Sequence, residues 1–166
     1  LGPGEEGEIA VRRAGDPVLL IEYWRNAEAT AEKTRDDWWR MGDAGTKDED
    51  GYFWFVGRAD DVITSAGYRI GPGEIEDCLC KHPAVTLAAA IGVPDPVRTE
   101  NIKVFIKLAA GHNGSPELGK DIQAFVKKHL SPHEYPRLIE FVSDLPMTAT
   151  GKIKRKDLRD AEIAKS

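Results

Sequence analysis

Cysteine is scarce in this sequence of 166 residues: only Cys78 and Cys80 are present, and no group of cysteine and histidine has the spacing of a metal site. The two cysteines lie two residues apart in an expected helix, so their side chains point to different faces and cannot easily bond to each other. Two free thiols are typical of a reducing compartment. We therefore expect a cytoplasmic protein in which this chain holds no disulfide and no metal ion.

Long hydrophobic runs are also missing. Apolar stretches such as residues 86–93 are far shorter than the ~20 residues that cross a bilayer, and the mean hydropathy is −0.42, so no membrane span is expected. Residues 1–8 have neither the basic nor the apolar segment of a signal peptide. Because the sequence starts without methionine and inside an expected turn, we interpret Leu1 as the cut end of a longer chain.

Charge and tryptophan are unevenly distributed along the chain. Residues 1–57 hold 7 basic and 13 acidic residues, residues 58–166 hold 16 and 15, and all four tryptophans precede Gly57. We therefore expect two domains, residues 1–57 and residues 58–166. From Thr150 onward there are 6 basic and 3 acidic residues, a balance that suits an anionic small molecule but is too weak to indicate nucleic acid.

The first domain is expected to be β-rich and incomplete. Residues 7–12 alternate as in a strand, and residues 52–56 are aromatic and β-branched after a turn signal at Asp50-Gly51. A short helix is expected near residues 27–33. Two strands and one helix do not make a complete core, so we interpret this part as the remnant of a large N-terminal domain.

The second domain is expected to be α+β. A hairpin of residues 61–65 and 68–70 precedes a helix that Pro72 opens. The sequence then predicts a small three-stranded sheet with flanking helices, from strands at 86–93, 102–108 and 138–142 and helices at 115–130 and from 155 onward.

Four short stretches could carry chemistry, although each alone also fits a turn, a linker or a surface loop. In chain order they are Trp39-Arg40-Met41-Gly42-Asp43, Gly57-Arg58-Ala59-Asp60-Asp61, Gly67-Tyr68-Arg69-Ile70-Gly71-Pro72-Gly73-Glu74-Ile75-Glu76 and Pro146-Met147-Thr148-Ala149-Thr150-Gly151-Lys152.

In this order and spacing, the stretches strongly resemble the C-terminal part of the adenylate-forming (AMP-binding) superfamily, which includes acyl-CoA synthetases, peptide-synthetase adenylation domains and beetle luciferases. The resemblance covers nearly the whole chain. The Gly-Arg-x-Asp-Asp junction at residues 57–61 looks most like acetyl- and medium-chain acyl-CoA synthetases, enzymes of fatty acid metabolism, because several other branches have lysine at the second acidic position. Tyr-Pro-Arg at residues 135–137 is also similar to the medium-chain group.

The resemblance implies a nucleotide site. Asp43 would accept hydrogen bonds from both ribose hydroxyls of ATP, which suits an acceptor-only carboxylate, and Arg58 would lie beside the same ribose. Arg69 would contact nucleotide phosphate, where a guanidinium matches paired oxygens. One residue departs from the family, which usually has threonine or serine where this chain has Met41, and this puts the phosphate contacts there in question.

The resemblance also implies that the second domain is a mobile lid. Asp60 would be its hinge, and Gly67 would line the pantetheine tunnel of coenzyme A, where a side chain would block close approach. Lys152 would be the catalytic lysine. Its ammonium would bridge the substrate carboxylate and the α-phosphate of ATP, reducing the repulsion between two anions in the transition state.

The expected enzyme is thus an acid–thiol ligase that converts a carboxylic acid and ATP to an acyl-adenylate and then transfers the acyl group to coenzyme A. The ATP phosphate loop, the acyl pocket and the Mg²⁺ site of the family would belong to the N-terminal domain, the lid's partner. We therefore expect the fragment to fold from Arg58 onward and to be inactive alone.

Two alternatives remain open. The acceptor could differ, as in a peptide-synthetase domain that loads a carrier protein or in a luciferase-like oxidase, although the Asp60-Asp61 pair disfavours both. Alternatively, the chain could be a non-catalytic module of the same fold, in which Lys152, Asp43 and Arg69 would have no reason to occur together.

Overall fold

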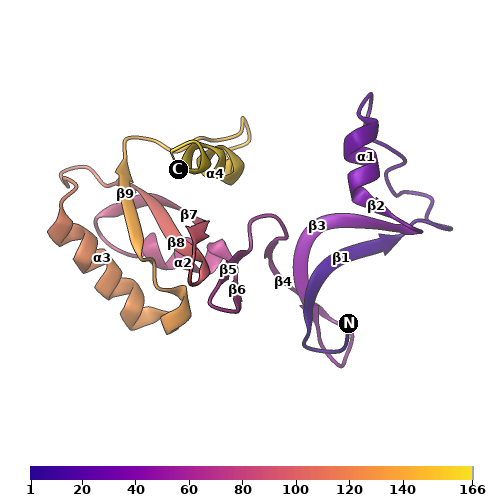
Figure 1. Cartoon of the computed structure of the whole chain (residues 1–166), viewed down its shortest axis with the longest axis horizontal. Coiled ribbons are helices and arrows are strands. Elements are labelled where there is room, and N and C mark those ends of the chain that lie inside the picture. Colours follow the sequence, from indigo (N-terminus) through magenta and orange to yellow (C-terminus); the bar gives the residue numbers. More distant parts are fainter. Residues whose placement is uncertain (166) are drawn as a thin grey trace. The chain divides into compact units, whose positions relative to one another are not determined.

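The computed structural model describes residues 1–165, which form two compact units, one from Leu1 to Asp60 and one from Asp61 onward (Figure 1). Each unit has its own sheet and helices, and we describe each by itself.

The first unit is a four-stranded antiparallel sheet with one short helix. Strand β3 pairs with β1, β2 and β4. Trp39 and Ala44 on β3 are the buried hydrophobic residues of this unit. The elements are β1 (Glu6–Arg12), α1 (Ala27–Lys33), β2 (Thr34–Arg35), β3 (Trp38–Lys47) and β4 (Phe53–Arg58).

Strand β3 is the longest element that sequence analysis missed, and the two-residue strand β2 was not predicted either. The residues of β3 were interpreted as a possible turn because Gly42-Asp43 resembles a turn signal, yet the ten-residue strand continues through both. Gly42 does have a positive φ of 76°, and the ladder to β4 shifts register between Ala44 and Gly45. The glycine therefore marks an irregularity inside a strand rather than the end of one.

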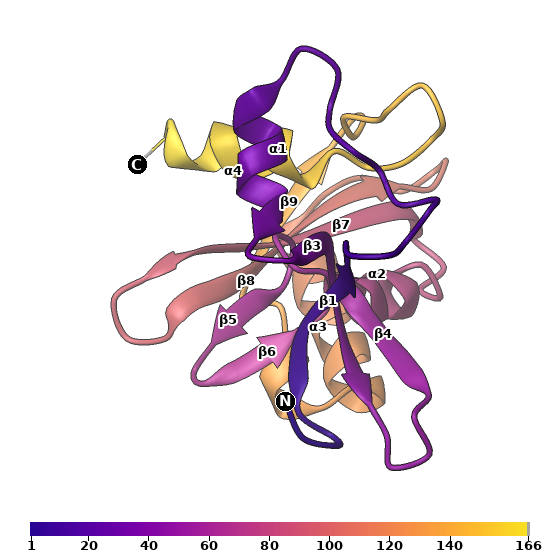
Figure 2. The same ribbon diagram turned by 90° about the vertical axis from the view of Figure 1, so that its right-hand side faces the viewer.

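The second unit contains a five-stranded sheet in the order β6-β5-β8-β7, with β9 pairing in parallel with β8. Figure 2 shows the β5–β6 hairpin beside β8. The predicted hairpin and three-stranded sheet are thus parts of one sheet, joined where Ser65 pairs with Thr99. The strands are β5 (Ile63–Ser65), β6 (Tyr68–Ile70), β7 (Val85–Asp95), β8 (Thr99–Leu108) and β9 (Leu138–Val142).

Helices cover both faces of this sheet, as Figure 1 shows for α3 and α4. Strand β7 is buried on both sides, so that Ala88 and Ala90 belong to one core cluster and Ala89 and Ile91 to the other. The first cluster includes residues of α2 (Pro72–Leu79) and α3 (Pro116–His129), and the second includes Leu158 of α4 (Arg155–Ile163). The α+β class and the predicted helices are confirmed. The short 3-10 helix Pro132–Glu134 was not predicted.

Replacement of Ile75 tests the first core cluster. The side chain is fully buried on α2, so Ile75→Ala should lower the free energy of unfolding by about 2–5 kcal/mol through lost burial and a residual cavity. Denaturant unfolding of this chain should be followed by circular dichroism, because all four tryptophans lie in the first unit. The control Val97→Ala, at a side chain that is 88% exposed, should change the free energy of unfolding by less than about 0.5 kcal/mol. Equal effects of the two substitutions would contradict the packing described.

Candidate functional site

Asp43 and Arg58 are brought together by the pairing of β3 with β4. They are direct cross-strand partners, and Arg58 Nη1 donates a hydrogen bond of 3.0 Å to Asp43 Oδ1. Both side chains remain accessible, at 32% and 46% exposure. A partly exposed carboxylate with one lone pair engaged keeps acceptor capacity for a polar ligand.

The backbone at Gly42 lies close to two cationic groups, Arg58 of this pair and Lys33. A Cβ at Gly42 would lie 2.6 Å from Lys33 Nζ and 2.8 Å from Arg58 Nη2. Glu8 supports the same segment from β1, since it accepts hydrogen bonds from the amide of Gly42 and from Arg40. The positive φ and the crowding by both cations therefore favour glycine here.

Asp60 is the last residue of the first unit, and it is loosely held. Its carboxylate is 66% exposed, with Oδ1 at 3.7 Å from Arg58 Nε. At that distance and exposure an ion pair contributes little, so side-chain contacts barely restrain this position.

In the second unit, Ala66 and Gly67 form the tight turn between β5 and β6. Both have positive φ, 51° and 85°, as a two-residue type I′ hairpin turn requires. A Cβ on Gly67 would meet no atom within 4 Å. Within this unit, backbone conformation rather than crowding therefore explains the glycine. Arg69 lies exposed on β6, opposite Thr64 of β5.

A cavity of about 270 Å³ adjoins this turn, and sequence analysis did not find it as a whole. Arg98 and Arg137 line it, together with Tyr68 and His133, whose rings stack at 4.3 Å and 6°. The carbonyl of Arg98 accepts the amide of Ala66 at 2.8 Å, which fixes the turn against the cavity. Two guanidinium groups beside aromatic faces suit an anionic ligand with an aromatic ring.

Lys152 lies in a loop that its own backbone closes. Thr148 N donates to Lys152 O at 2.8 Å, and Lys152 N donates to Thr148 Oγ1 at 3.0 Å. Met147 and Ile153 form an isolated antiparallel bridge across the same loop. The lysine side chain is exposed, and its ammonium makes no ion pair with any residue of the described range 1–165. The loop thus presents a free cation on a constrained backbone.

An ion-pair cluster lies at the base of this loop, and sequence analysis did not predict it. Arg155, the first residue of α4, donates to both carboxylate oxygens of Glu76, at 2.9 and 2.5 Å, and to Asp61 at 3.2 Å. Arg159, one helical turn later, donates to Asp61 at 2.6 Å. The hydrogen bond to Glu76 is the main reason that the pKa of Arg155 is raised. The partners in each of these pairs are 79 or more residues apart along the chain and only the fold brings them together, so spacing alone could not reveal them.

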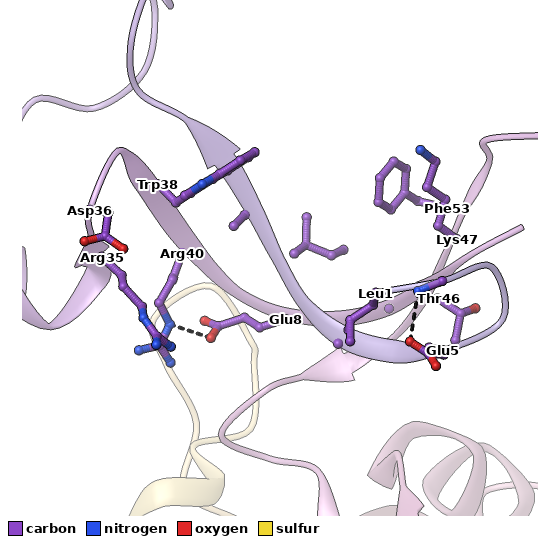
Figure 3. Close-up of a pocket in the computed structure, with 15 residues that line it drawn as sticks. Leu1, Glu5, Glu8, Arg35, Asp36, Trp38, Arg40, Thr46, Lys47 and Phe53 are labelled. Carbon is purple, nitrogen blue, oxygen red and sulfur yellow. Dashed lines mark hydrogen bonds and ion pairs between the residues drawn. The ribbon is translucent and has the colours of Figure 1, made fainter.

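A second cavity, of about 510 Å³, lies on the sheet of the first unit. Figure 3 shows Glu8 and Arg40 pointing toward each other in it from β1 and β3, at 2.6 Å, with Leu1 and Phe53 at the other end. Arg40 belongs to one of the four stretches that could carry chemistry, but none of the residues to which the resemblance assigns a role lines this cavity, so volume alone does not mark the site.

The described residues show no cluster of three or more histidine, cysteine, aspartate or glutamate side chains able to hold a metal ion. No helix within residues 1–165 is both long enough and apolar enough to cross a bilayer.

Comparison with known proteins agrees with the motifs. Residues 74–152 match the AMP-binding enzyme C-terminal domain family. The chain is 52% identical to the human mitochondrial acyl-coenzyme A synthetase ACSM2B in an alignment that covers 98% of this chain and 29% of that protein. The chain thus spans less than a third of the length of the curated relatives it matches.

Solved structures give the same result. An acyl-CoA synthetase from Brucella canis is 48% identical with a TM-score of 0.64, covering 99% of this chain and 30% of that one. The anthranilate CoA ligase AuaEII, in complex with anthranoyl-AMP, is 37% identical with a TM-score of 0.81, covering 99% and 32%. The chain therefore carries the C-terminal domain of an AMP-binding enzyme and belongs to the adenylate-forming superfamily.

Proposed function

We propose that this chain is the C-terminal part of an AMP-forming acyl-CoA synthetase and that Lys152 catalyses its first half-reaction. The observation that carries the proposal is a free, exposed ammonium on a hydrogen-bonded loop of the AMP-binding C-terminal domain. The sequence likeness to acyl-coenzyme A synthetases supports the choice of reaction.

In the first step, an oxygen of the substrate carboxylate attacks the α-phosphorus of ATP, and the bond to the bridging oxygen breaks to release pyrophosphate. Two anions must approach each other, so negative charge accumulates at one point. The Lys152 ammonium offsets this repulsion between the carboxylate and the α-phosphate. A positioned charge stabilises a transition state more than a mobile one because little reorganisation is needed.

Asp43 and Arg58 are proposed to hold the ribose of the nucleotide. The carboxylate would accept hydrogen bonds from the two hydroxyls, while Arg58 orients it from the neighbouring strand. Arg69, exposed on β6, is proposed to contact nucleotide phosphate in the assembled enzyme.

In the second step, the thiol of coenzyme A loses its proton and attacks the acyl carbon, and AMP leaves. We propose that the second domain turns about Asp60 between the two steps, withdrawing Lys152 and presenting the Gly67 turn. The weak restraint on the Asp60 side chain suits a residue that absorbs a change in backbone dihedrals.

The cavity beside the Gly67 turn is proposed to receive the nucleotide end of coenzyme A. Its phosphates match Arg98 and Arg137, and its adenine matches the aromatic faces of Tyr68 and Tyr135. This assignment distinguishes coenzyme A from a carrier-protein acceptor, because a carrier protein presents pantetheine without the adenosine group.

The remaining parts of the enzyme are proposed to lie in a larger N-terminal domain, which the greater length of the relatives supports. That domain would supply the acyl pocket and the Mg²⁺ that accompanies ATP. The described residues do not fit a metal site, so we assign them no step through magnesium.

We propose only that the protein lies in a reducing compartment of the cell. Cys78 is buried and Cys80 exposed, and both are free thiols. The sequence analysis favoured the cytoplasm on this ground, whereas the similar human acyl-coenzyme A synthetase ACSM2B is named as mitochondrial. Free thiols do not distinguish these two locations.

Loss of the Lys152 charge should stop the first step. In the complete enzyme, Lys152→Ala should lower acid-dependent exchange of pyrophosphate into ATP by about a thousandfold, or roughly 4 kcal/mol of barrier. Transfer from presynthesised acyl-adenylate to coenzyme A should change by less than about threefold, because that step does not use the ammonium. Exchange at the wild-type rate would refute the proposed role.

Replacement of Gly42 should disturb the ribose site. Gly42→Ala combines a positive φ with displacement of Lys33 and Arg58, so the KM for ATP should rise by about tenfold, given a strain of roughly 1–2 kcal/mol. The control Gly119→Ala, in α3 with no atom within 4 Å of the added Cβ, should leave the KM unchanged. Steady-state kinetics with varied ATP measures both, and an unchanged KM in Gly42→Ala would contradict the assignment.

Removal of Arg98 should weaken coenzyme A binding selectively. Arg98→Ala should raise the KM for coenzyme A by about tenfold or more, because a charge-assisted hydrogen bond contributes roughly 1.5–3 kcal/mol. Turnover with pantetheine as acceptor should not change, and Lys120→Ala, an exposed cation of α3 outside the cavity, should affect neither. Equal losses with coenzyme A and pantetheine would show that Arg98 acts on the fold instead.

A further inference from the structure

Two adjacent residues at the boundary of the units are held very differently. Asp60 is 66% exposed, and the structure gives its carboxylate one ion pair, at 3.7 Å. Asp61 is 12% exposed and lies between two arginines, with contacts of 3.2 Å to Arg155 and 2.6 Å to Arg159. The weakly restrained side chain of Asp60 is thus followed directly by that of Asp61, which two arginines hold. We call Asp61 with Arg155 and Arg159 the clamp.

The clamp is a connected network rather than a single pair. Arg155 also binds Glu76 through two nitrogens, and Glu76 in turn accepts the amide of Ala90 on β7. The network therefore ties the start of the second unit to α2, to the central sheet and to α4. Partly buried, geometrically matched pairs of this kind restrain position more firmly than exposed pairs do.

The same network fixes one end of the loop that carries Lys152. Arg155 follows Lys152 by three residues and begins α4. At the other end of the loop, Leu145 is buried in the second core cluster beside Leu158 of α4. The position of the loop therefore depends on α4, and the first residues of α4 depend on Asp61.

We propose that Asp61, held by Arg155 and Arg159, is a positioning residue that makes the Lys152 loop move as one rigid body with the backbone that rotates at the hinge, Asp60. This inference rests on the proposed function, since it gives the Lys152 loop its task. In this arrangement the backbone rotates at Asp60 but not at Asp61, and the ion pairs of Asp61 with Arg155 and Arg159 carry the rotation directly to the base of α4. The Gly67 turn is connected to the hinge through different contacts, namely through β5 and the pairing of β5 with β8.

The two sets of contacts have different consequences for the two half-reactions. Loosening the clamp should misplace Lys152 and slow adenylation, while thioester formation, which uses the Gly67 turn, should be spared. In the complete enzyme, Asp61→Asn should lower the kcat of acid-dependent pyrophosphate exchange by about tenfold, since misplacement by about 1 Å can cost up to a hundredfold. The KM for ATP and the rate of transfer from presynthesised acyl-adenylate to coenzyme A should each change less than about twofold.

A matched control exists at the other end of α4. Glu162 forms an ion pair of 2.6 Å with the largely buried Lys103, so Glu162→Gln also removes a helix-anchoring charge but lies away from the hinge. It should lower thermal stability as much as Asp61→Asn does and leave the ratio of the two half-reactions at the wild-type value. Asp61→Glu should restore part of the lost exchange.

If Asp61→Asn does not fold, Arg159→Gln replaces it, because this variant removes one contact of Asp61 and keeps the Arg155–Glu76 pair. An equal loss in both half-reactions, or the same ratio in the Asp61 and Glu162 variants, would overturn the positioning role alone. A wild-type enzyme without acid-dependent exchange would overturn the proposed function and this inference with it.

Discussion

Strand β8 is the element on which the second unit depends. Its antiparallel ladder with β7 runs from the pair of Leu108 with Val85 to the pair of Thr99 with Asp95. Its parallel ladder with β9 runs from the pair of Lys103 with Leu138 to the pair of Lys107 with Val142. It also pairs with β5, where Thr99 lies opposite Ser65. Both loops to which we assign chemistry are connected to this ladder. The Gly67 turn extends from β5, and the Lys152 loop follows β9 and returns into α4, which packs on β7.

The arrangement separates buried anchors from exposed reactive groups. Leu145 and Leu158 lie in the core, and Asp61 and Arg155 are largely buried, whereas Lys152 and the Gly67 turn are exposed. A side chain that must meet a substrate on another domain has to be accessible, and its position must come from the residues behind it. One sheet can then support two faces that act in turn, provided that the unit moves as a rigid body.

The sequence predicted regular elements well where the pattern was local. The helix at α3 followed from its apolar spacing, and the Ala66-Gly67 turn followed from its glycine between two short strands. Strand β3 was missed because a glycine at positive φ inside a strand looks like a turn. The joining of hairpin and sheet was missed because it rests on one long-range pair, Ser65 with Thr99. The site residues came from motif resemblance, while the Arg155 cluster and the cavity at Arg98 are long-range features that required the fold.

The central claim is that a positive charge at position 152 drives adenylation. It is tested most directly by restoring that charge chemically in the complete enzyme with Lys152→Cys, using bromoethylamine to form a side chain that ends in an ammonium. Wild-type enzyme treated in the same way controls for reaction at the exposed Cys80. The account predicts that pyrophosphate exchange, nearly absent in Lys152→Cys, recovers by about a hundredfold after treatment. Exchange that stays at the level of the untreated variant, while treated wild-type enzyme remains active, would contradict it.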